Sequence, residues 1–90
     1  MAVLLVTYEF KTAGKDYSAF FETLKNTPQK WWHYLENVWI VETDLSADAF
    51  AKKLYPHFSQ DDRVLVTRIT SDQQGWLQKE AWEWLNNRKY

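Results

Sequence analysis

The feature that most constrains the fold of this chain is its first apolar run, Ala2–Tyr8 (AVLLVTY). The run is apolar at both alternating positions, as is typical of a central strand that is covered on both faces. A sheet built around this strand therefore needs cover on two sides. We expect the 90 residues to form one domain, with a core over residues 1–70 and a tryptophan-rich C-terminal helix over residues 71–90.

The next segment carries the signals of an amphipathic helix. Gly14 marks a turn, and Asp16 is a residue type that caps helices. The apolar residues that follow have the spacing of one helical stripe; they are Tyr17, Phe20, Phe21 and Leu24. Residues 26–28 (NTP) predict the end of this helix.

A hairpin is predicted in the middle of the chain. Two aromatic and β-branched runs, Trp31–Leu35 and Val38–Thr43, are joined by the dipeptide Glu36-Asn37. A two-residue link that contains Asn between such runs is typical of a β-hairpin.

A second helix and a last strand follow. Ser46 is a capping residue, and Leu45 and Phe50 have the spacing of a hydrophobic staple around it. Pro56 predicts the end of this helix, and Arg63–Ile69 has the alternation of a strand. From residue 71 onward we expect a third helix, with an apolar face and tryptophans at its margins; the face holds Leu77, Ala81, Trp84 and Leu85, and the margins hold Trp76 and Trp82.

The predicted element order, β-α-β-β-α-β followed by a helix, indicates a ferredoxin-like α+β fold. With right-handed crossovers the four strands form one antiparallel sheet, with the first and third strands in the middle. The two crossover helices then cover a single face, although both central strands are apolar towards two. The C-terminal helix, a second subunit or both must cover the other face, and we therefore expect a homodimer.

Three short motifs resemble a known family. They are the first-strand ending VTYE (residues 6–9), NVWIVETDLS (residues 37–46) and DRVLV (residues 62–66). Over roughly residues 1–69 the chain is similar to the small CRISPR-adaptation endoribonuclease family and its short SinR-annotated relatives. The resemblance implies a ferredoxin-like homodimer whose sheets face each other, and a metal-dependent nuclease with one aspartate per subunit at the end of the first strand.

The chain departs from this family in two places. Glu9 stands at the position of the aspartate, and a tryptophan-rich helix replaces the further strand that pairs across the dimer in many members. Because of these departures, binding without efficient turnover is predicted ahead of catalysis, and a role in spacer acquisition is not predicted.

Glu9 is the best single candidate for catalysis. The end of the first strand lies beside the start of the third in an antiparallel sheet, and Glu36 and Asp16 approach the same rim. Three carboxylates there could hold a hard cation such as Mg²⁺ or Mn²⁺. The alternative is that Glu9 is a solvated strand-end charge, Asp16 a helix cap and Glu36 a turn residue, which is the commoner situation. The neighbouring pair Asp61-Asp62 is interpreted as polar turn residues before a strand.

Aromatic and cationic groups come together on the expected edge strand. Trp31, Trp32 and Tyr34 lie near Lys30 and His33 in the sequence, a combination that stacks on unpaired bases in other proteins. Alternate strand residues face opposite sides, so Trp31 and Trp32 cannot line one surface. We expect at least one of them in the core, and the other in a dimer contact.

The tail tryptophans raise the same choice, between a ligand cage and packing or interface anchors. Trp76, Trp82 and Trp84 are expected to be packing or interface anchors. The chain holds six tryptophans, five tyrosines and five phenylalanines, more aromatic surface than one small core usually contains. Some of that surface is therefore expected to face a partner.

Composition and motifs exclude several classes of function. Cysteine is absent, which removes disulfides, thiolate metal sites and cysteine nucleophiles. Two glycines cannot build a Gly-rich phosphate loop, and no serine lies in a nucleophile elbow. His33 and His57 belong to no zinc-ligand pattern, so we interpret both as structural. The net charge of -1 gives no support for a strongly basic nucleic-acid footprint.

The sequence predicts a cytoplasmic protein without a membrane partner. Its longest apolar stretch is far too short to span a bilayer. Met1 leads directly into the first strand, without a basic leader or a cleavage site.

The functional prediction is a small homodimeric binding protein of the CRISPR-adaptation-endoribonuclease-like group, which contacts RNA, DNA or a protein without efficient turnover. One alternative is a metal-dependent endonuclease that uses Glu9 from each subunit. Another is an interaction protein of a phage or mobile element, with which the small size and the aromatic excess are compatible.

Overall fold

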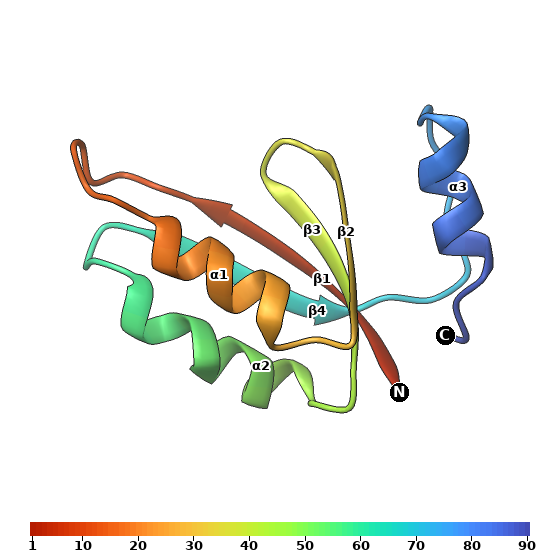
Figure 1. The fold of residues 1–90 in the computed structure, drawn as a ribbon, viewed down its shortest axis with the longest axis horizontal. Coiled ribbons are helices and arrows are strands. Elements are labelled where there is room, and N and C mark those ends of the chain that lie inside the picture. The colour runs from red at the N-terminus through yellow and green to blue at the C-terminus, as the bar shows by residue number, and fades with distance from the viewer.

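The predicted element order is present in the computed structural model, which describes residues 1–90 (Figure 1). The elements are β1 (Ala2–Glu9), α1 (Ser18–Asn26), β2 (Lys30–Leu35), β3 (Val38–Thr43), α2 (Ala47–Leu54), the 3₁₀ helix η1 (Tyr55–His57), β4 (Arg63–Arg68) and α3 (Lys79–Asn86). None of these helices has the length and apolar character of a membrane span. The cytoplasmic location stays a prediction.

The four strands form one antiparallel sheet in the order β2-β3-β1-β4. Leu4 of β1 pairs with Val41 of β3 on one side, and Val6 pairs with Val66 of β4 on the other. The two central strands are thus β1 and β3, as predicted. This strand order, with both crossover helices on one face, confirms the predicted α+β class and is compatible with a ferredoxin-like fold.

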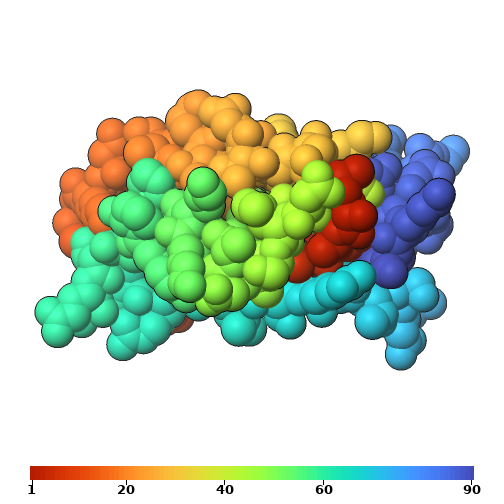
Figure 2. Space-filling view, turned by 90° about the horizontal axis from the view of Figure 1, so that it is seen from below, coloured from red at the N-terminus to blue at the C-terminus, as the bar shows by residue number.

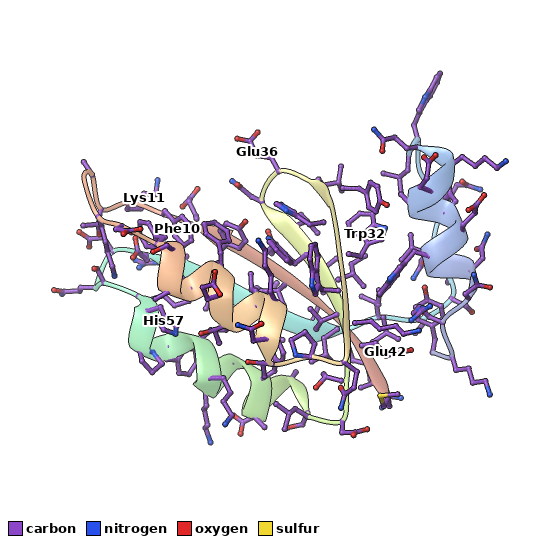
Figure 3. All side chains as sticks on the ribbon, in the orientation of Figure 1. Phe10, Lys11, Trp32, Glu36, Glu42 and His57 are labelled. Atoms are coloured by element: carbon purple, nitrogen blue, oxygen red, sulfur yellow. The ribbon has the colours of Figure 1, made fainter.

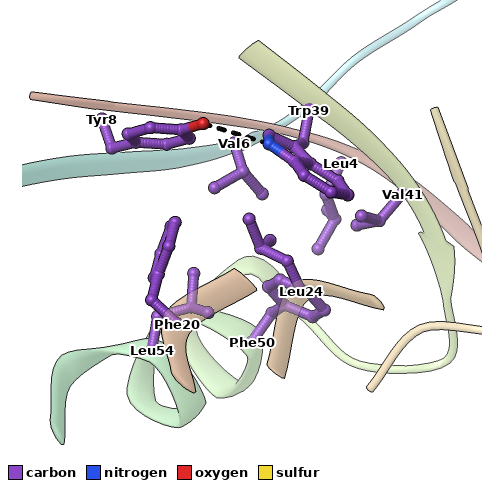
Figure 4. Close-up of a cluster of buried hydrophobic side chains, with 9 residues drawn as sticks. All are labelled: Leu4, Val6, Tyr8, Phe20, Leu24, Trp39, Val41, Phe50 and Leu54. Atoms are coloured by element: carbon purple, nitrogen blue, oxygen red, sulfur yellow. Dashed lines mark hydrogen bonds between the residues drawn. The ribbon is translucent and has the colours of Figure 1, made fainter. Parts of the chain in front are cut away.

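The first face of the sheet is covered by α1 and α2, which lie side by side (Figure 1). Between them and the sheet lies the main core (Figure 4); it consists of Leu4, Val6, Tyr8, Phe20, Leu24, Trp39, Val41, Phe50 and Leu54. The indole Nε1 of Trp39 donates a hydrogen bond to the Tyr8 hydroxyl at 3.1 Å, so the polar atoms of two buried rings satisfy each other. Burial raises the pKa of Tyr8.

Local sequence signals explain where the two helices begin. The Ser46 hydroxyl accepts from the Ala49 N–H at 3.1 Å and caps α2, while Leu45 packs against the cluster that holds Phe50, as the staple predicted. α1 begins with Tyr17 at the N-cap position, and the Asp16 carboxylate accepts from the Ser18 N–H at 2.9 Å. That hydrogen bond lowers the pKa of Asp16.

The tail helix is shorter than predicted, because α3 begins at Lys79 and not at residue 71. The preceding segment makes local bonds that compete with a helix. The Thr70 hydroxyl accepts from the Asp72 N–H at 3.2 Å, and the Gln73 side chain donates to the Thr70 carbonyl at 2.7 Å. Gly75 further disfavours a helix here. Residues 71–78 are therefore a connector.

α3 packs on the second face of the sheet and covers one end of it. The second buried cluster consists of Val3, Trp32, Ile40, Ala81 and Leu85. Trp32 points towards α3 (Figure 3), and its indole Nε1 donates to the Ala81 carbonyl at 3.2 Å. Arg88 pairs with Glu42 of β3 at 3.1 Å and lies over the Trp84 ring at 4.3 Å. In the space-filling view the C-terminal segment occupies one end of the molecule, beside the N-terminus (Figure 2).

Candidate binding surfaces

The alternation of β2 divides its aromatic residues between two surfaces. Trp32 is 2% exposed and belongs to the second-face core, whereas Trp31 is 43% exposed and lies on the side of α1. The prediction that the two tryptophans cannot share a surface is therefore confirmed. Tyr34 is also 43% exposed, and its ring centroid lies 5.3 Å from that of Trp32.

The first surface, which we call the aromatic edge, is the hollow between β2 and α1. It measures about 630 Å³ and is lined by seven residues: Ser18, Phe21, Glu22, Lys25, Trp31, His33 and Trp39. The His33 ring stacks on Trp39 with a centroid distance of 4.2 Å and an interplanar angle of 15°. The Trp31 ring lies 5.0 Å from Trp39, and the Lys25 ammonium lies 5.8 Å from the Trp31 centroid.

The second surface, which we call the open face, is the part of the second sheet face that α3 leaves uncovered. Leu65 is 59% exposed and Leu35 is 46% exposed, and Leu5 lies on the same side of the sheet. Beside them a hollow of about 410 Å³ separates the sheet from the tail, and most of its lining is apolar. Trp76, in the connector, is completely exposed and belongs to neither buried cluster. The packing role predicted for it is therefore wrong, and the interface role stays a prediction.

The connector and α3 place the other tail residues on the second-face cluster. Leu77 lies outside the helix, yet it packs against this cluster together with Trp82 and Trp84. Of the two roles predicted for Trp82, packing and interface anchor, the structure confirms packing within the chain.

The structure does not assemble the three predicted carboxylates. The chain contains no group of three or more His, Asp or Glu side chains that could hold a metal ion. The Glu9 carboxylate pairs with the Lys11 ammonium at 3.4 Å, Asp16 bonds to its own helix, and Glu36 lies at the hairpin tip (Figure 3). Glu9 belongs to the alternating set of Val3 and Leu5 on the second face, whereas α1 lies on the first. The donor set of one chain therefore does not fit a metal ion.

Asp62 was predicted to be a polar turn residue, but the structure shows a buried carboxylate in a hydrogen-bond network. Its side chain is buried, and it accepts from the N–H groups of Lys11 at 2.8 Å and Ser59 at 2.9 Å, and from the Tyr17 hydroxyl at 2.8 Å. The Lys15 ammonium lies 3.9 Å away. Burial by itself would raise the pKa of Asp62, but these donors and the cation outweigh it and lower the pKa to about 2. Asp62 thus ties the β1–α1 loop to the start of β4.

No signal in the sequence distinguishes Asp62 from its exposed neighbour Asp61. Both precede a strand, where polar turn residues are common. The two residues differ only in the folded chain, where the β1–α1 loop approaches Asp62 and supplies hydrogen-bond donors from residues 11–17. Because its oxygens are occupied by these donors, Asp62 holds the fold together and is not free for chemistry.

The two histidines make structural contacts. His33 Nε2 lies 2.9 Å from the Glu36 carbonyl, to which it must donate. His57 Nε2 lies 2.9 Å from the Thr23 hydroxyl, which itself donates to the Ala19 carbonyl. Neither histidine has a metal-ligand cluster around it.

No protein-family model matches the chain, and neither a curated protein nor a solved structure does so. The resemblance to the CRISPR-adaptation endoribonuclease family therefore stays a prediction.

Proposed function

We propose that this protein is a small homodimeric binding protein, in which the open face joins two copies and another surface contacts nucleic acid or a protein without efficient turnover. The observation that carries the proposal is the unequal cover of the second sheet face. Ile40 is 6% exposed beneath α3, whereas Leu65, on the same side of the sheet, is 59% exposed. A sheet face that is apolar beyond its own helix favours a partner.

A second copy is the partner that suits this face best. Fully burying one leucine side chain stabilises by about 1.5–3 kcal/mol, and a tryptophan such as Trp76 buries roughly 150–250 Å². Stable interfaces bury about 800 Å² per partner, which a few such side chains and the surrounding strand surface can supply. The net charge of -1 keeps the repulsion between two copies small. Glu9 and Arg63 are register partners at the rim of the patch, so its border carries both signs of charge.

Sedimentation velocity at tens of micromolar tests the dimer. We expect the wild type to sediment as a dimer and Leu65→Lys to sediment as a monomer, because a charge would be buried in the interface. Tyr55→Lys is the matched control, since Tyr55 is 54% exposed but lies outside the open face; it should remain dimeric. A wild type that is a clean monomer contradicts the dimer.

Catalysis by paired Glu9 residues is a second candidate, and one observation favours it. Glu9 is exposed and belongs to the strand positions that face the open side, so a dimer through this face would bring two copies of Glu9 to a common rim. A single chain has too few ligands for a metal ion, so this activity requires the dimer. Cleavage of RNA or DNA in Mg²⁺ or Mn²⁺ should then be slow and should disappear with EDTA or in Glu9→Gln. Cleavage that survives both treatments contradicts this candidate.

A further inference from the structure

The lining of the aromatic edge favours one kind of ligand. All of its apolar residues are aromatic, namely Phe21, Trp31 and Trp39, and no aliphatic side chain takes part. Its volume of about 630 Å³ lies in the range of ligand sites. An aliphatic anchor of a partner protein would find few aliphatic groups here, whereas a flat aromatic ligand would find ring faces and ring edges.

The rings of this site already contact one another in the free chain. Trp39 is 1% exposed and is fixed by its hydrogen bond to Tyr8. His33 stacks on Trp39 and is also tied to the Glu36 carbonyl, and Trp31 packs against Trp39 at a tilt of 43°. Trp31 and His33 nevertheless remain exposed. Because the rings are already ordered, a ligand that stacks on them loses little conformational entropy in the protein.

Polar groups surround these rings on the side of α1. The Lys25 ammonium lies near the Trp31 ring and forms no ion pair in the chain. Glu22 and Ser18 line the same hollow. A cation without an ion-pair partner suits a phosphate, while a carboxylate and a hydroxyl can bond to the exocyclic groups of a base.

We infer that the aromatic edge binds an unpaired base of single-stranded nucleic acid, which stacks on Trp31 and His33 while Lys25 contacts a neighbouring phosphate. Single-strand binding sites combine aromatic platforms with cations in this way. A duplex hides the faces of its bases and is a poorer ligand. The inference deepens the binding role proposed above, but it does not require the dimer, because the site lies on the helix side of the sheet within one chain.

Fluorescence anisotropy with labelled single-stranded DNA and RNA of about ten nucleotides tests this site. We expect both strands to bind, and a duplex of the same length to bind more weakly. Trp31→Ala should weaken binding by roughly tenfold or more, because a base–aromatic stack is lost. Trp31→Phe keeps an aromatic face and should retain most of the affinity. Lys25→Ala should reduce the salt dependence by about 0.7 in log–log slope, which corresponds to one phosphate contact on a single strand.

Tyr55→Ala is the matched control, because it removes an aromatic side chain that is 54% exposed and lies outside both this hollow and the open face. Its affinity for the oligonucleotides should equal that of the wild type. Lys25→Glu alters only an exposed side chain, so it should weaken oligonucleotide binding while the chain stays folded. Three results would overturn the inference. Folded Trp31→Ala could bind the oligonucleotides as tightly as the wild type, the duplex could bind as tightly as the single strands, or the chain could bind a protein but no oligonucleotide. A monomeric wild type that still binds single strands contradicts the dimer and supports this site.

Discussion

The two faces of the sheet are closed in different ways. On the first face two helices and the sheet enclose nine buried residues, and the Trp39 indole donates a hydrogen bond to the Tyr8 hydroxyl within this core. On the second face a single short helix buries five residues at one end, and a hollow of about 410 Å³ and exposed leucines remain beside it. Both faces are built from the same central strands, which alternate apolar residues towards each side.

The comparison shows that chain connectivity guarantees cover for one face of the sheet but not for the other. A β-α-β unit places its crossover helix on the sheet, so the first face is covered as soon as the strands pair. The second face depends on a tail that returns through a connector and is held by a few contacts, chiefly the Trp32–Ala81 hydrogen bond and the Glu42–Arg88 ion pair. A face that is covered by an appended element can be left half open, and here that open half is the candidate interface.

The largest effect is expected when the cover of the second face is removed. Deletion of residues 75–90 exposes Val3, Trp32 and Ile40 and removes the acceptor of the Trp32 indole. Fully burying each such side chain is worth about 1.5–3 kcal/mol, and together they rival the ~5–15 kcal/mol stability of a domain. The truncated chain should be unfolded or aggregated by circular dichroism and light scattering. A soluble truncation with an unchanged melting curve would show that α3 is only an appended arm.

A pair of identical substitutions measures the difference between the faces directly. Leu54 is 0% exposed in the first-face core, and Leu85 is 3% exposed in the second. Leu54→Ala should cost ~3–5 kcal/mol, because the packed surroundings leave a cavity. Leu85→Ala should cost ~2–3 kcal/mol, because Leu85 already borders a hollow and fewer contacts are lost. Urea unfolding measures both values. Equal costs would mean that the second face is packed as well as the first.

The smallest of the three effects concerns Asp62, whose hydrogen bonds connect the β1–α1 loop to the start of β4. Its pKa in the folded chain is about 2, below the usual 3.8. A lowered pKa means that its stabilisation is fully present above the usual pKa and is lost as the pH falls from about 4 to about 2. Asp62→Asn should lower the melting temperature by several degrees at pH 7 and remove this part of the acid sensitivity. Asp61→Asn, at the exposed neighbour, should do neither; if both variants melt alike, the hydrogen-bond network around Asp62 is not stabilising.

Much of the fold follows from short-range patterns in the sequence. The doubly apolar run of Ala2–Tyr8 predicted a central strand, the cap and staple around Ser46 predicted the start of α2, and the Glu36-Asn37 link predicted the hairpin. These signals depend on residues two to five positions apart, which the sequence alone displays. The late start of α3 was missed because periodic apolar residues extend back to Leu77, while side-chain bonds to the backbone around Thr70 prevent the helix.

The sequence by itself therefore determined the element order, the α+β class and the need to cover a second face. Only the tertiary structure decided how far α3 covers that face, which tryptophan of β2 is buried, and why Asp62 and not Asp61 is enclosed. It also decided that Glu9, Asp16 and Glu36 stay apart, while Trp31, His33 and Lys25 meet at one hollow. The physical reason is that such juxtapositions depend on strand register and on where loops and helices come to rest. These are set by many weak contacts between distant residues, and no local spacing records them.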